Sequence, residues 1–322
     1  MTDEPLTYAD SGVDIADSEA ATGALVSALA DLDTDDFAGV LDIGDRYLAL
    51  ATDGVGTKLL VADAVDDYST IGIDCIAMNA NDLVAMGVEP IGFVDYLAVD
   101  RPSESLAAEI GEGLAEGANQ ANLALLGGET AVLPEIVTGF DLAGACVGIA
   151  EKGELLASQA EPGDALIGFP SSGIHSNGLT LARKAIERHH AYSDPMPDDR
   201  SQTIGEALLE PTKLYTDLLP LLREYPVRGA AHITGGGFTN LRRLGEHRYN
   251  IRNPLPAQSI FDVIQSAGSV TDEEMHRTFN MGTGFVLAVP DDSAEKIVAE
   301  SNGQIIGEVI KGDAIQVRGC SL

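Results

Sequence analysis

Apolar residues recur along the chain with two spacings, one that favours strands and one that favours helices. Short apolar runs bounded by turn residues predict strands, and runs with apolar residues three or four positions apart predict helices. Residues 70–99 fit a helix followed by a strand, with Gly87 near the end of the helix and Pro90 beyond it. The other expected strands lie within residues 47–56, 123–130, 139–151, 165–173, 282–290 and 303–312. The other expected helices lie within residues 21–32, 103–122, 178–190 and 201–225.

Helices and strands are mixed in both halves of the chain, which predicts an α/β (α+β) fold with two mixed α/β domains. Between them, the stretch EKGELLASQAEPGDAL at 151–166 replaces the periodic pattern with turn residues before a new strand begins. We therefore place an N-terminal domain over residues 1–157 and a C-terminal domain over residues 158–322.

The charge of the chain is strongly acidic. Its 322 residues include 51 acidic and 19 basic ones, which gives a formal net charge of −32. Such a surface repels the phosphates of nucleic acids and of anionic membranes, so neither is an expected partner. Because the acids are spread through helical segments and not gathered in a tail, they indicate a folded, halophilic protein adapted to a salt-rich cytoplasm.

Nothing in the sequence predicts export or a thiolate metal site. The first 20 residues are acidic and lack the apolar core of a signal peptide. The sequence has no run of about 18 apolar residues, so no membrane span is expected. Cys75, Cys146 and Cys320 are far apart and form no CxxC pair. A cytoplasmic location with reduced thiols is therefore expected.

Four glycine-rich stretches lie at the ends of expected strands or the starts of expected helices. They are TDGVGTK at 52–58, LGGET at 126–130, SSGIHSNG at 171–178 and TGGGF at 234–238. Glycine lets backbone N–H groups approach an anion, and a helix N-terminus adds partial positive charge. None matches the Walker A sequence or the Rossmann fingerprint. Each alone fits a plain turn equally well, but four in one chain favour phosphate binding.

Three acids stand where they could hold magnesium, which prefers hard oxygen ligands and bridges phosphate oxygens. Asp53 and Glu129 each lie beside a glycine, and Asp82 lies in the apolar stretch IAMNANDLVAM. In so acidic a chain, a single Asp is more often a solvated surface group. Asp82 is harder to explain that way, because a buried carboxylate is costly unless a metal or a donor meets it.

His175 is the histidine that the pattern favours for proton transfer. It lies in a loop of glycine and serine just before an expected helix, where an imidazole can meet a ligand. His189, His190 and His247 have the polar neighbours typical of surface groups, whereas His232 and His276 are ambiguous. No GxSxG elbow is present, so covalent acyl chemistry has no support.

Several stretches occur together in the order found in one family. They are YADSGVDI, ATDGVGTKL, TIGIDCIAMNANDLVAMGVEP, LLGGETAVLP, FDLAGACVGI, SSGIHSNGLTLARK, LLEPTKLY, HITGGGF and FNMGTGFVLAVP. This set resembles phosphoribosylformylglycinamidine cyclo-ligase, also called aminoimidazole ribonucleotide synthetase, of purine biosynthesis. The resemblance runs from about Tyr8 to Pro290. Related enzymes such as thiamine monophosphate kinase share the acids, but HSNG, GGGF and FNMGTG together favour the cyclo-ligase.

The resemblance implies an N-terminal domain whose strands join those of a second subunit in a barrel at a homodimer interface. It implies ATP with Mg2+, K+ as a further candidate cation, and formylglycinamidine ribonucleotide as the small-molecule substrate. ATP would phosphorylate the formyl amide oxygen, and an amidine nitrogen would then close the imidazole ring and expel phosphate. Such chemistry needs positioning, metal and backbone donors more than a protein nucleophile.

The resemblance also assigns residues to this chemistry. It implies that His175, Asp53 and Asp82 act in catalysis and that Asp53, Asp82 and Glu129 bind magnesium. Lys58 would pair with phosphate or with a neighbouring acid. The expected positions for ATP and its phosphates are Gly54, Gly56, Thr57, Lys58, Asn81, Gly127 and Gly128. The expected substrate positions are Ser171, Ser172, Gly173, Asn177, Gly235, Gly236 and Gly237.

One segment departs from the family pattern. In TDDFAGVLDI at 34–43, Asp35 and Asp36 stand where many relatives have glycines. Bacterial relatives often carry lysines or arginines just upstream, whereas ALVSALADLD at 24–33 has none. Either nucleotide contacts come from elsewhere, or bound cations offset the missing positive charge. Two other functions stay open: another ATP-dependent kinase or synthetase, such as thiamine monophosphate kinase, and a catalytically silent nucleotide-binding subunit.

Overall fold

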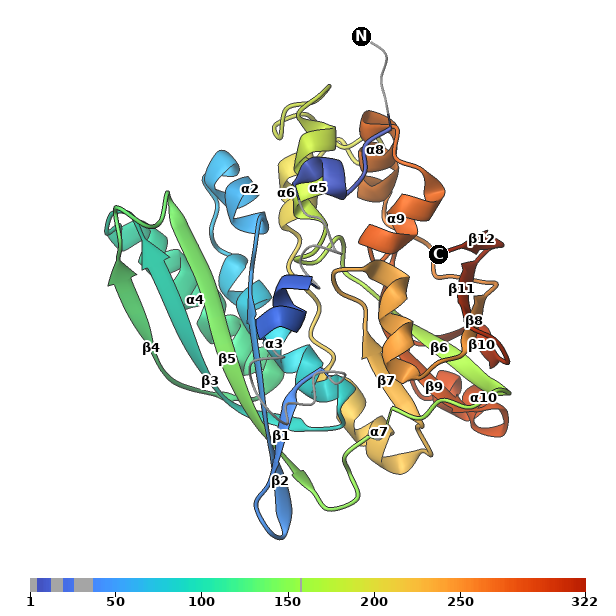
Figure 1. The fold of residues 1–322 in the computed structure, drawn as a ribbon. Coiled ribbons are helices and arrows are strands. Elements are labelled where there is room, and N and C mark those ends of the chain that lie inside the picture. The colour runs from blue at the N-terminus through green and yellow to red at the C-terminus, as the bar shows by residue number, and fades with distance from the viewer. Residues whose placement is uncertain (1–4, 13–19, 26–36, 157) are drawn as a thin grey trace.

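Two β-sheets flanked by helices form the protein, one from each half of the chain (Figure 1). The structure is a computed structural model that describes residues 5–12, 20–25, 37–156 and 158–322. The expectation of two mixed α/β units is confirmed. The boundary at residue 157 falls on a residue outside this description and stays a prediction. Asp35, Asp36 and most of the helix expected at 21–32 also lie outside it.

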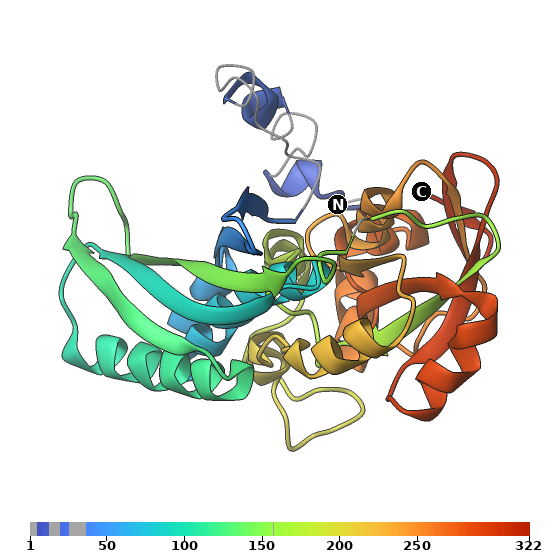
Figure 2. The same cartoon turned by 90° about the horizontal axis from the view of Figure 1, so that it is seen from below.

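The first sheet has five strands in the order β1-β2-β5-β3-β4. Its strands are β1 (Gly39–Asp42), β2 (Arg46–Gly54), β3 (Glu89–Val99), β4 (Ala124–Val132) and β5 (Phe140–Glu151). Only β3 and β4 pair in parallel, and the helix that connects them runs beneath the sheet in Figure 2. The sheet is open, with β1 and β4 at its edges, so the described chain alone forms no closed barrel.

Two helices cover one face of this sheet and approach each other closely. They are α3 (Ile71–Ala85) and α4 (Glu104–Ala121), and α2 (Lys58–Val65) precedes them. Ser103 caps α4 by accepting a hydrogen bond from the Leu106 N–H. Glycine permits the close approach, because a Cβ on Gly72 would lie 2.1 Å from the backbone nitrogen of Leu114. Almost every residue of α3 is buried, since α3 lies between the two sheets.

The second sheet has seven strands in the order β12-β11-β8-β10-β6-β9-β7. Its strands are β6 (Asp164–Pro170), β7 (Gly229–His232), β8 (Arg248–Ile251), β9 (Thr283–Pro290), β10 (Gln304–Ile310), β11 (Ala314–Val317) and β12 (Cys320–Ser321). The α-helices of this half are α5 (Leu179–Ile186), α6 (Ile204–Leu209), α7 (Leu219–Glu224), α8 (Ser259–Gly268), α9 (Asp272–Thr278) and α10 (Asp291–Ala299). The described 3-10 helices are η1 (Ala9–Ser11), η2 (Thr216–Leu218) and η3 (Gly237–Leu244), and residues 20–25 are also helical. No described helix is long and apolar enough to cross a membrane.

The expectation of one helix over residues 201–225 is wrong. The chain forms α6, then an extended segment over residues 210–215, then η2 and α7. The break follows from Pro211, because the residue before a proline is driven out of helical geometry, and Glu210 has φ −47° and ψ 122°. The extended segment lies against α3 and supplies backbone groups to the site described below.

The expectation that a strand ends at the glycine pair 127–128 is also wrong. β4 continues through both glycines to Val132. The register against β3 shifts here, so that Leu126 is an extra residue in β4 and Gly127 adopts φ 143°. A Cβ on Gly128 would lie 2.2 Å from Oδ1 of Asp95 on β3, so only glycine leaves room for that carboxylate. LGGET is therefore strand and not a loop.

Candidate active site

Two acids from different elements lie close enough for the charge of one to act on the other. Asp53 stands near the end of β2, and Asp82 stands in the last turn of α3. The amide of Asn79 donates to the Asp53 carbonyl over 3.1 Å, which ties the end of β2 to α3. Surrounding protein and then the negative charge of Asp82 raise the pKa of Asp53 to about 6, although its side chain still reaches solvent. A cation near Asp53 would offset both the burial of this carboxylate and the charge of Asp82.

Asp82 is held by a histidine from the other half of the chain. Nδ1 of His232, at the end of β7, lies 2.9 Å from Oδ1 of Asp82. The His232 side chain is fully buried, whereas that of Asp82 is 18% exposed. His232 fitted a site or the core equally well from the sequence, and it touches the acid that the sequence singled out. The contact spans 150 positions, so no local pattern could predict it.

The two loops expected to bind substrate converge on the same side of α3. Asn177 donates to the sulfur of Met78, one turn before Asp82, over 3.7 Å. A Cβ on Gly235 would lie 3.1 Å from Oδ1 of Asn177, so the HSNG and TGGGF loops are neighbours. Gly236 and Gly237 have φ angles of 94° and 53°, which glycine adopts readily. Substrate positions that lie about 60 residues apart in sequence are therefore brought together by the fold.

A buried asparagine that the sequence did not single out fixes the loop at 171–173. Asn280 donates to the Gly173 carbonyl over 2.9 Å and accepts from the Ser171 hydroxyl at the same distance. The only sequence signal for it was its place in FNMGTG. Ser172 also donates to the Pro211 carbonyl over 2.5 Å, which joins this loop to the extended segment. The loop is therefore held on both sides before any ligand binds.

Lys58 is engaged by an acid and not by an open site. Its side chain and that of Asp74 are both fully buried, with Nζ 2.8 Å from Oδ2 and 2.9 Å from Oδ1. Nζ also donates to the Glu210 carbonyl over 2.7 Å, and Asp74 accepts from the N–H and hydroxyl of Thr212. Of the two expected partners of Lys58, the structure shows the neighbouring acid. Removing one member of such a buried pair typically costs about 3–5 kcal/mol, so Lys58 holds the two halves together.

Asn81 and Thr57, two expected nucleotide contacts, already have protein partners. The Asn81 amide donates to the Lys213 carbonyl over 2.8 Å and accepts from the Tyr215 N–H over 2.9 Å. Thr57 shares a 2.8 Å hydrogen bond with Thr180 at the start of α5. Asn81 is also fully buried. The polar side-chain atoms of Asn81 bind the backbone at residues 213–215. This arrangement therefore does not present Asn81 for direct contact with ATP.

His175 lies inside the protein and has a left-handed backbone with φ 61°. Nε2 accepts from the N–H groups of Ser172 and Lys213 over 3.3 and 3.5 Å, whereas Nδ1 is buried without a partner. Burial holds its pKa well below the usual range. The ring is therefore neutral, with its proton on Nδ1. It can donate this proton in a hydrogen bond, but it is not a stored imidazolium acid.

Glu129 is not brought to Asp53 and Asp82. It lies on β4, and two strands separate β4 from β2, so three interstrand steps of about 4.8 Å intervene. Glu129 also pairs with Tyr96, whereas Asp53 shares its row with Gly144 and Asp95, so the two acids point to opposite faces. Among the described residues, no group of three or more His, Cys, Asp or Glu side chains could hold a metal.

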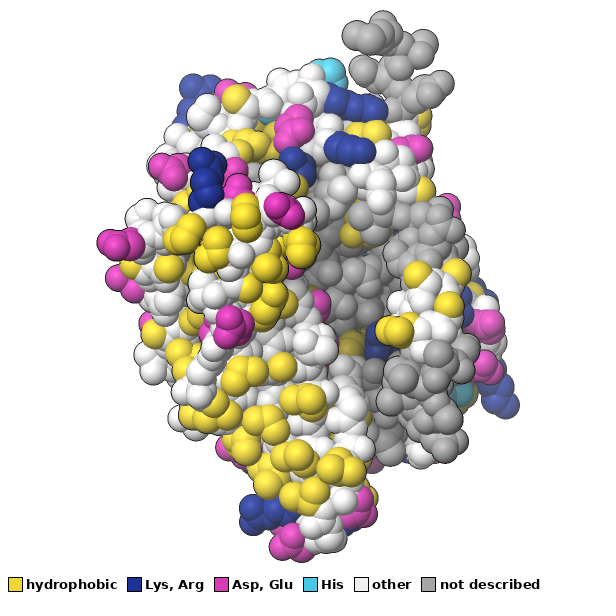
Figure 3. Space-filling model, turned by 60° about the vertical axis from the view of Figure 1, so that its left-hand side comes forward, with side chains coloured by type: hydrophobic (Ala, Val, Ile, Leu, Met, Phe, Trp, Pro, Cys, Tyr) yellow, Lys and Arg dark blue, Asp and Glu magenta, His cyan; other side chains and the backbone are white. Residues whose placement is uncertain are grey.

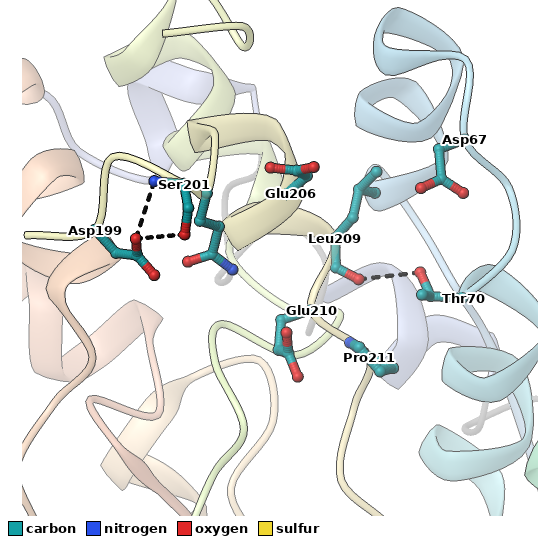
Figure 4. Close-up of a pocket in the computed structure, with 9 residues that line it drawn as sticks. Asp67, Thr70, Asp199, Ser201, Glu206, Leu209, Glu210 and Pro211 are labelled. Carbon is teal, nitrogen blue, oxygen red and sulfur yellow. Dashed lines mark hydrogen bonds between the residues drawn. The ribbon is translucent and has the colours of Figure 1, made fainter. Parts of the chain in front are cut away.

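A pocket of about 440 Å³ elsewhere is unsuited to a polyanion. It lies between α6 and the chain before α3, and four of its lining residues are acids: Asp67, Asp199, Glu206 and Glu210 (Figure 4). Asp199 accepts from the N–H and hydroxyl of Ser201, and Glu206 forms the capping box of α6. No lysine or arginine lines this pocket. Because four carboxylates line it, this pocket is not where phosphate is expected.

Sequence comparisons relate both halves of the chain to known domains. Residues 35–150 match the profile of AIR synthase related protein, N-terminal domain, and residues 161–320 match that of its C-terminal domain. A phosphoribosylformylglycinamidine cyclo-ligase of Methanosarcina acetivorans is 46% identical over 97% of this chain and 97% of its own. One of Methanocaldococcus jannaschii is 43% identical over 98% of this chain and 94% of its own.

Solved structures share the fold at low sequence identity. The structure of AaThiL complexed with AMPPCP and TMP covers 96% of both chains with a TM-score of 0.72 and 14% identity. T. maritima PurL complexed with ATP covers 88% of this chain and 44% of its own, with a TM-score of 0.59 and 17% identity. These likenesses support the arrangement of the two sheets.

Proposed function

This chain belongs to the phosphoribosylformylglycinamidine cyclo-ligase family, and we propose that the space bounded by Asp53, Asp82, Asn177 and Gly235 is its active site. The protein is an ATP-dependent ligase of purine biosynthesis that converts formylglycinamidine ribonucleotide to aminoimidazole ribonucleotide. The observation that carries the site assignment is the pair Asp53 and Asp82, placed by two elements beside the glycine loops.

Asp53 and Asp82 fit a magnesium ion that accompanies ATP. Magnesium takes oxygen ligands, and one or two carboxylates with substrate phosphates often suffice. Burial and then the charge of Asp82 raise the pKa of Asp53, and a divalent cation would favour the charged carboxylate. When bound, the metal would neutralise phosphate charge during transfer. Glu129 can join this set only from a second subunit, because of its place on β4.

The glycine loops are suited to hold the ribonucleotide phosphate. Gly236 and Gly237 have positive φ angles, and the loop at 171–173 is fixed by hydrogen bonds. Both loops can therefore present backbone N–H groups to a phosphate without intervening side chains. The γ-phosphate of ATP is transferred to the formyl amide oxygen, and the amidine nitrogen displaces it as the ring closes, releasing ADP and phosphate. His175, neutral with Nδ1–H free, would donate a hydrogen bond to the developing oxyanion after a local shift of its loop.

We further propose that the uncovered face of the first sheet is a homodimer interface. On β2 and β3, Ala51 and Phe93 point to the buried face, whereas Leu50, Val94 and Tyr96 point outward and are exposed. Apolar side chains gather over this side of the molecule in Figure 3. Large exposed apolar patches on soluble proteins commonly mark interfaces. Two such faces packed together would give the barrel expected for the family.

Molar KCl should raise the melting temperature, shift the protein toward the dimer and lower the KM for ATP. Two subunits of charge −32 repel each other, and the Debye length falls from about 30 Å at 0.01 M salt to about 3 Å at 1 M. Calorimetry, sedimentation and initial rates measure the three effects. NaCl separates screening from a K+ requirement, and sucrose at matched water activity controls for hydration. Equal behaviour at about 0.05 M and about 2 M KCl would contradict the prediction.

The reaction itself is tested with purified protein and ATP. We expect ADP release that depends on formylglycinamidine ribonucleotide, together with formation of aminoimidazole ribonucleotide. Thiamine monophosphate serves as the matched control, because a related kinase would phosphorylate it. ADP release stimulated by thiamine monophosphate alone would assign the chain to that activity. Nucleotide binding without turnover of either compound would indicate a silent subunit.

A further inference from the structure

A chain of buried hydrogen bonds leads from the extended segment at 213–215 to the Asp82 carboxylate. The Tyr215 N–H donates to Oδ1 of Asn81 over 2.9 Å, and Nδ2 of Asn81 donates to the Lys213 carbonyl over 2.8 Å. Nδ2 also lies 3.4 Å from Nε2 of His232, and Nδ1 of His232 lies 2.9 Å from Oδ1 of Asp82. These hydrogen bonds connect the segment at 213–215, α3 and β7. The last of them reaches Asp82, a candidate metal ligand.

The direction of each hydrogen bond in this chain is determined by its two ends. A backbone N–H can only donate and a carbonyl can only accept, so the orientation of the Asn81 amide is fixed. Its Nδ2 therefore faces Nε2 of His232, which must accept, and the proton of the neutral ring is on Nδ1. Nδ1–H then donates to Asp82. The protein, not a ligand, sets the tautomer.

The imidazole of His232 has little freedom to turn. Its side chain is fully buried, and its ring packs against those of Tyr215 and Phe285, with centroids 6.4 Å from each. Among the described residues, none donates to Oδ2 of Asp82. One oxygen of this carboxylate is thus anchored, and the other is left for a ligand.

We propose that His232 is a positioning residue that holds Asp82 in place for the divalent cation. Without this donor, repulsion between Asp82 and Asp53 would favour rotation of the Asp82 side chain away from the shared space. Donors behind a metal ligand typically change metal affinity by about 10–100-fold when removed. The inference rests on the proposed function only in taking Asp82 as a metal ligand, and it adds a residue that the sequence left unassigned.

Two substitutions separate the hydrogen bond from the packing of the ring. His232→Phe keeps an aromatic ring beside Tyr215 and Phe285 but has no donor. His232→Asn places an amide nitrogen at the position of Nδ1, because both lie three bonds from Cα, and it should restore the contact with Asp82. His190→Phe, at an exposed histidine outside the proposed active site, is the matched control for loss of an imidazole.

The readout is Mn2+ binding to the protein with a non-hydrolysable ATP analogue, followed by electron paramagnetic resonance. We expect His232→Phe to weaken Mn2+ by about 10–100-fold, with His232→Asn and His190→Phe within a few-fold of wild type. In the cyclisation assay, His232→Phe should lower kcat at fixed magnesium, and added Mn2+ should restore part of it. The KM for the ribonucleotide should change little.

Equal Mn2+ affinity in wild type and His232→Phe would overturn the inference, as would equal losses in the Phe and Asn variants. Melting temperatures show whether each variant is folded. If His232→Phe does not fold, His232→Gln carries the same test, because its amide lies one bond further from Cα and misses Asp82. The proposed function fails separately, when wild-type protein does not cyclise the ribonucleotide. Weaker Mn2+ binding by His232→Phe than by wild type would then still support the positioning role of His232.

Discussion

Asp82→Asn should lower kcat by about 10²–10³-fold, because losing a charged metal ligand removes several kcal/mol of transition-state stabilisation. The change is well matched to the structure. The Asn amide oxygen can still accept from Nδ1 of His232, so the contact between the two halves is kept while the charge is lost. Melting temperature should therefore change little. Steady-state kinetics at several magnesium concentrations measure the effect.

The Asp82→Asn variant can also be tested through its effect on the pKa of Asp53. The charge of Asp82 is one cause of the raised pKa of Asp53, so Asp82→Asn should bring that pKa below about 6. Titration followed by carbon NMR of the carboxyl groups would show the shift. Asp45→Asn, at an exposed acid in the turn between β1 and β2, is the control. Wild-type turnover of Asp82→Asn at ordinary magnesium would exclude Asp82 as a ligand.

His175→Ala should lower kcat by about 10²–10⁴-fold if the imidazole acts on the reacting oxygen or on a proton during ring closure. ATP binding should change less. Because φ at residue 175 is 61°, alanine adds backbone strain, and His175→Asn is the better-matched variant since asparagine tolerates this conformation. Initial rates with both substrates measure the effect. A change in KM for the ribonucleotide alone would limit His175 to substrate binding.

The depressed pKa of His175 also predicts how stability depends on pH. The folded protein binds this proton less readily than the unfolded chain, whose histidine titrates near its usual pKa of about 6.5. The stabilising contribution of neutral His175 is therefore present above that pH and is lost as pH falls below it. The melting temperature of wild type should drop more between pH 7 and pH 5 than that of His175→Asn. Parallel curves would mean that His175 is not buried in the neutral form.

The sequence was sufficient for the elements whose pattern is local. Apolar periodicity located β2, α3, β3, α4 and β9, because a strand or helix with a buried face must repeat that face in its sequence. The ordered motifs identified the family. The two wrong expectations, a single helix over residues 201–225 and a strand end at residues 127–128, also came from local patterns. Pro211 breaks the helix expected over residues 201–225, and a glycine pair that looks like a turn lies inside β4 at a bulge.

Only the tertiary structure decided which polar groups meet. Asp82 meets His232, Lys58 meets Asp74 and the Glu210 carbonyl, and Glu129 stands apart from Asp53 because of strand order and side-chain alternation. Each of these relations depends on how two sheets and α3 pack, over separations of up to 152 residues. Packing is set by the shapes of whole elements and not by the residues near one acid. The sequence therefore determined which side chains could carry the chemistry, and the fold determined which of them act together.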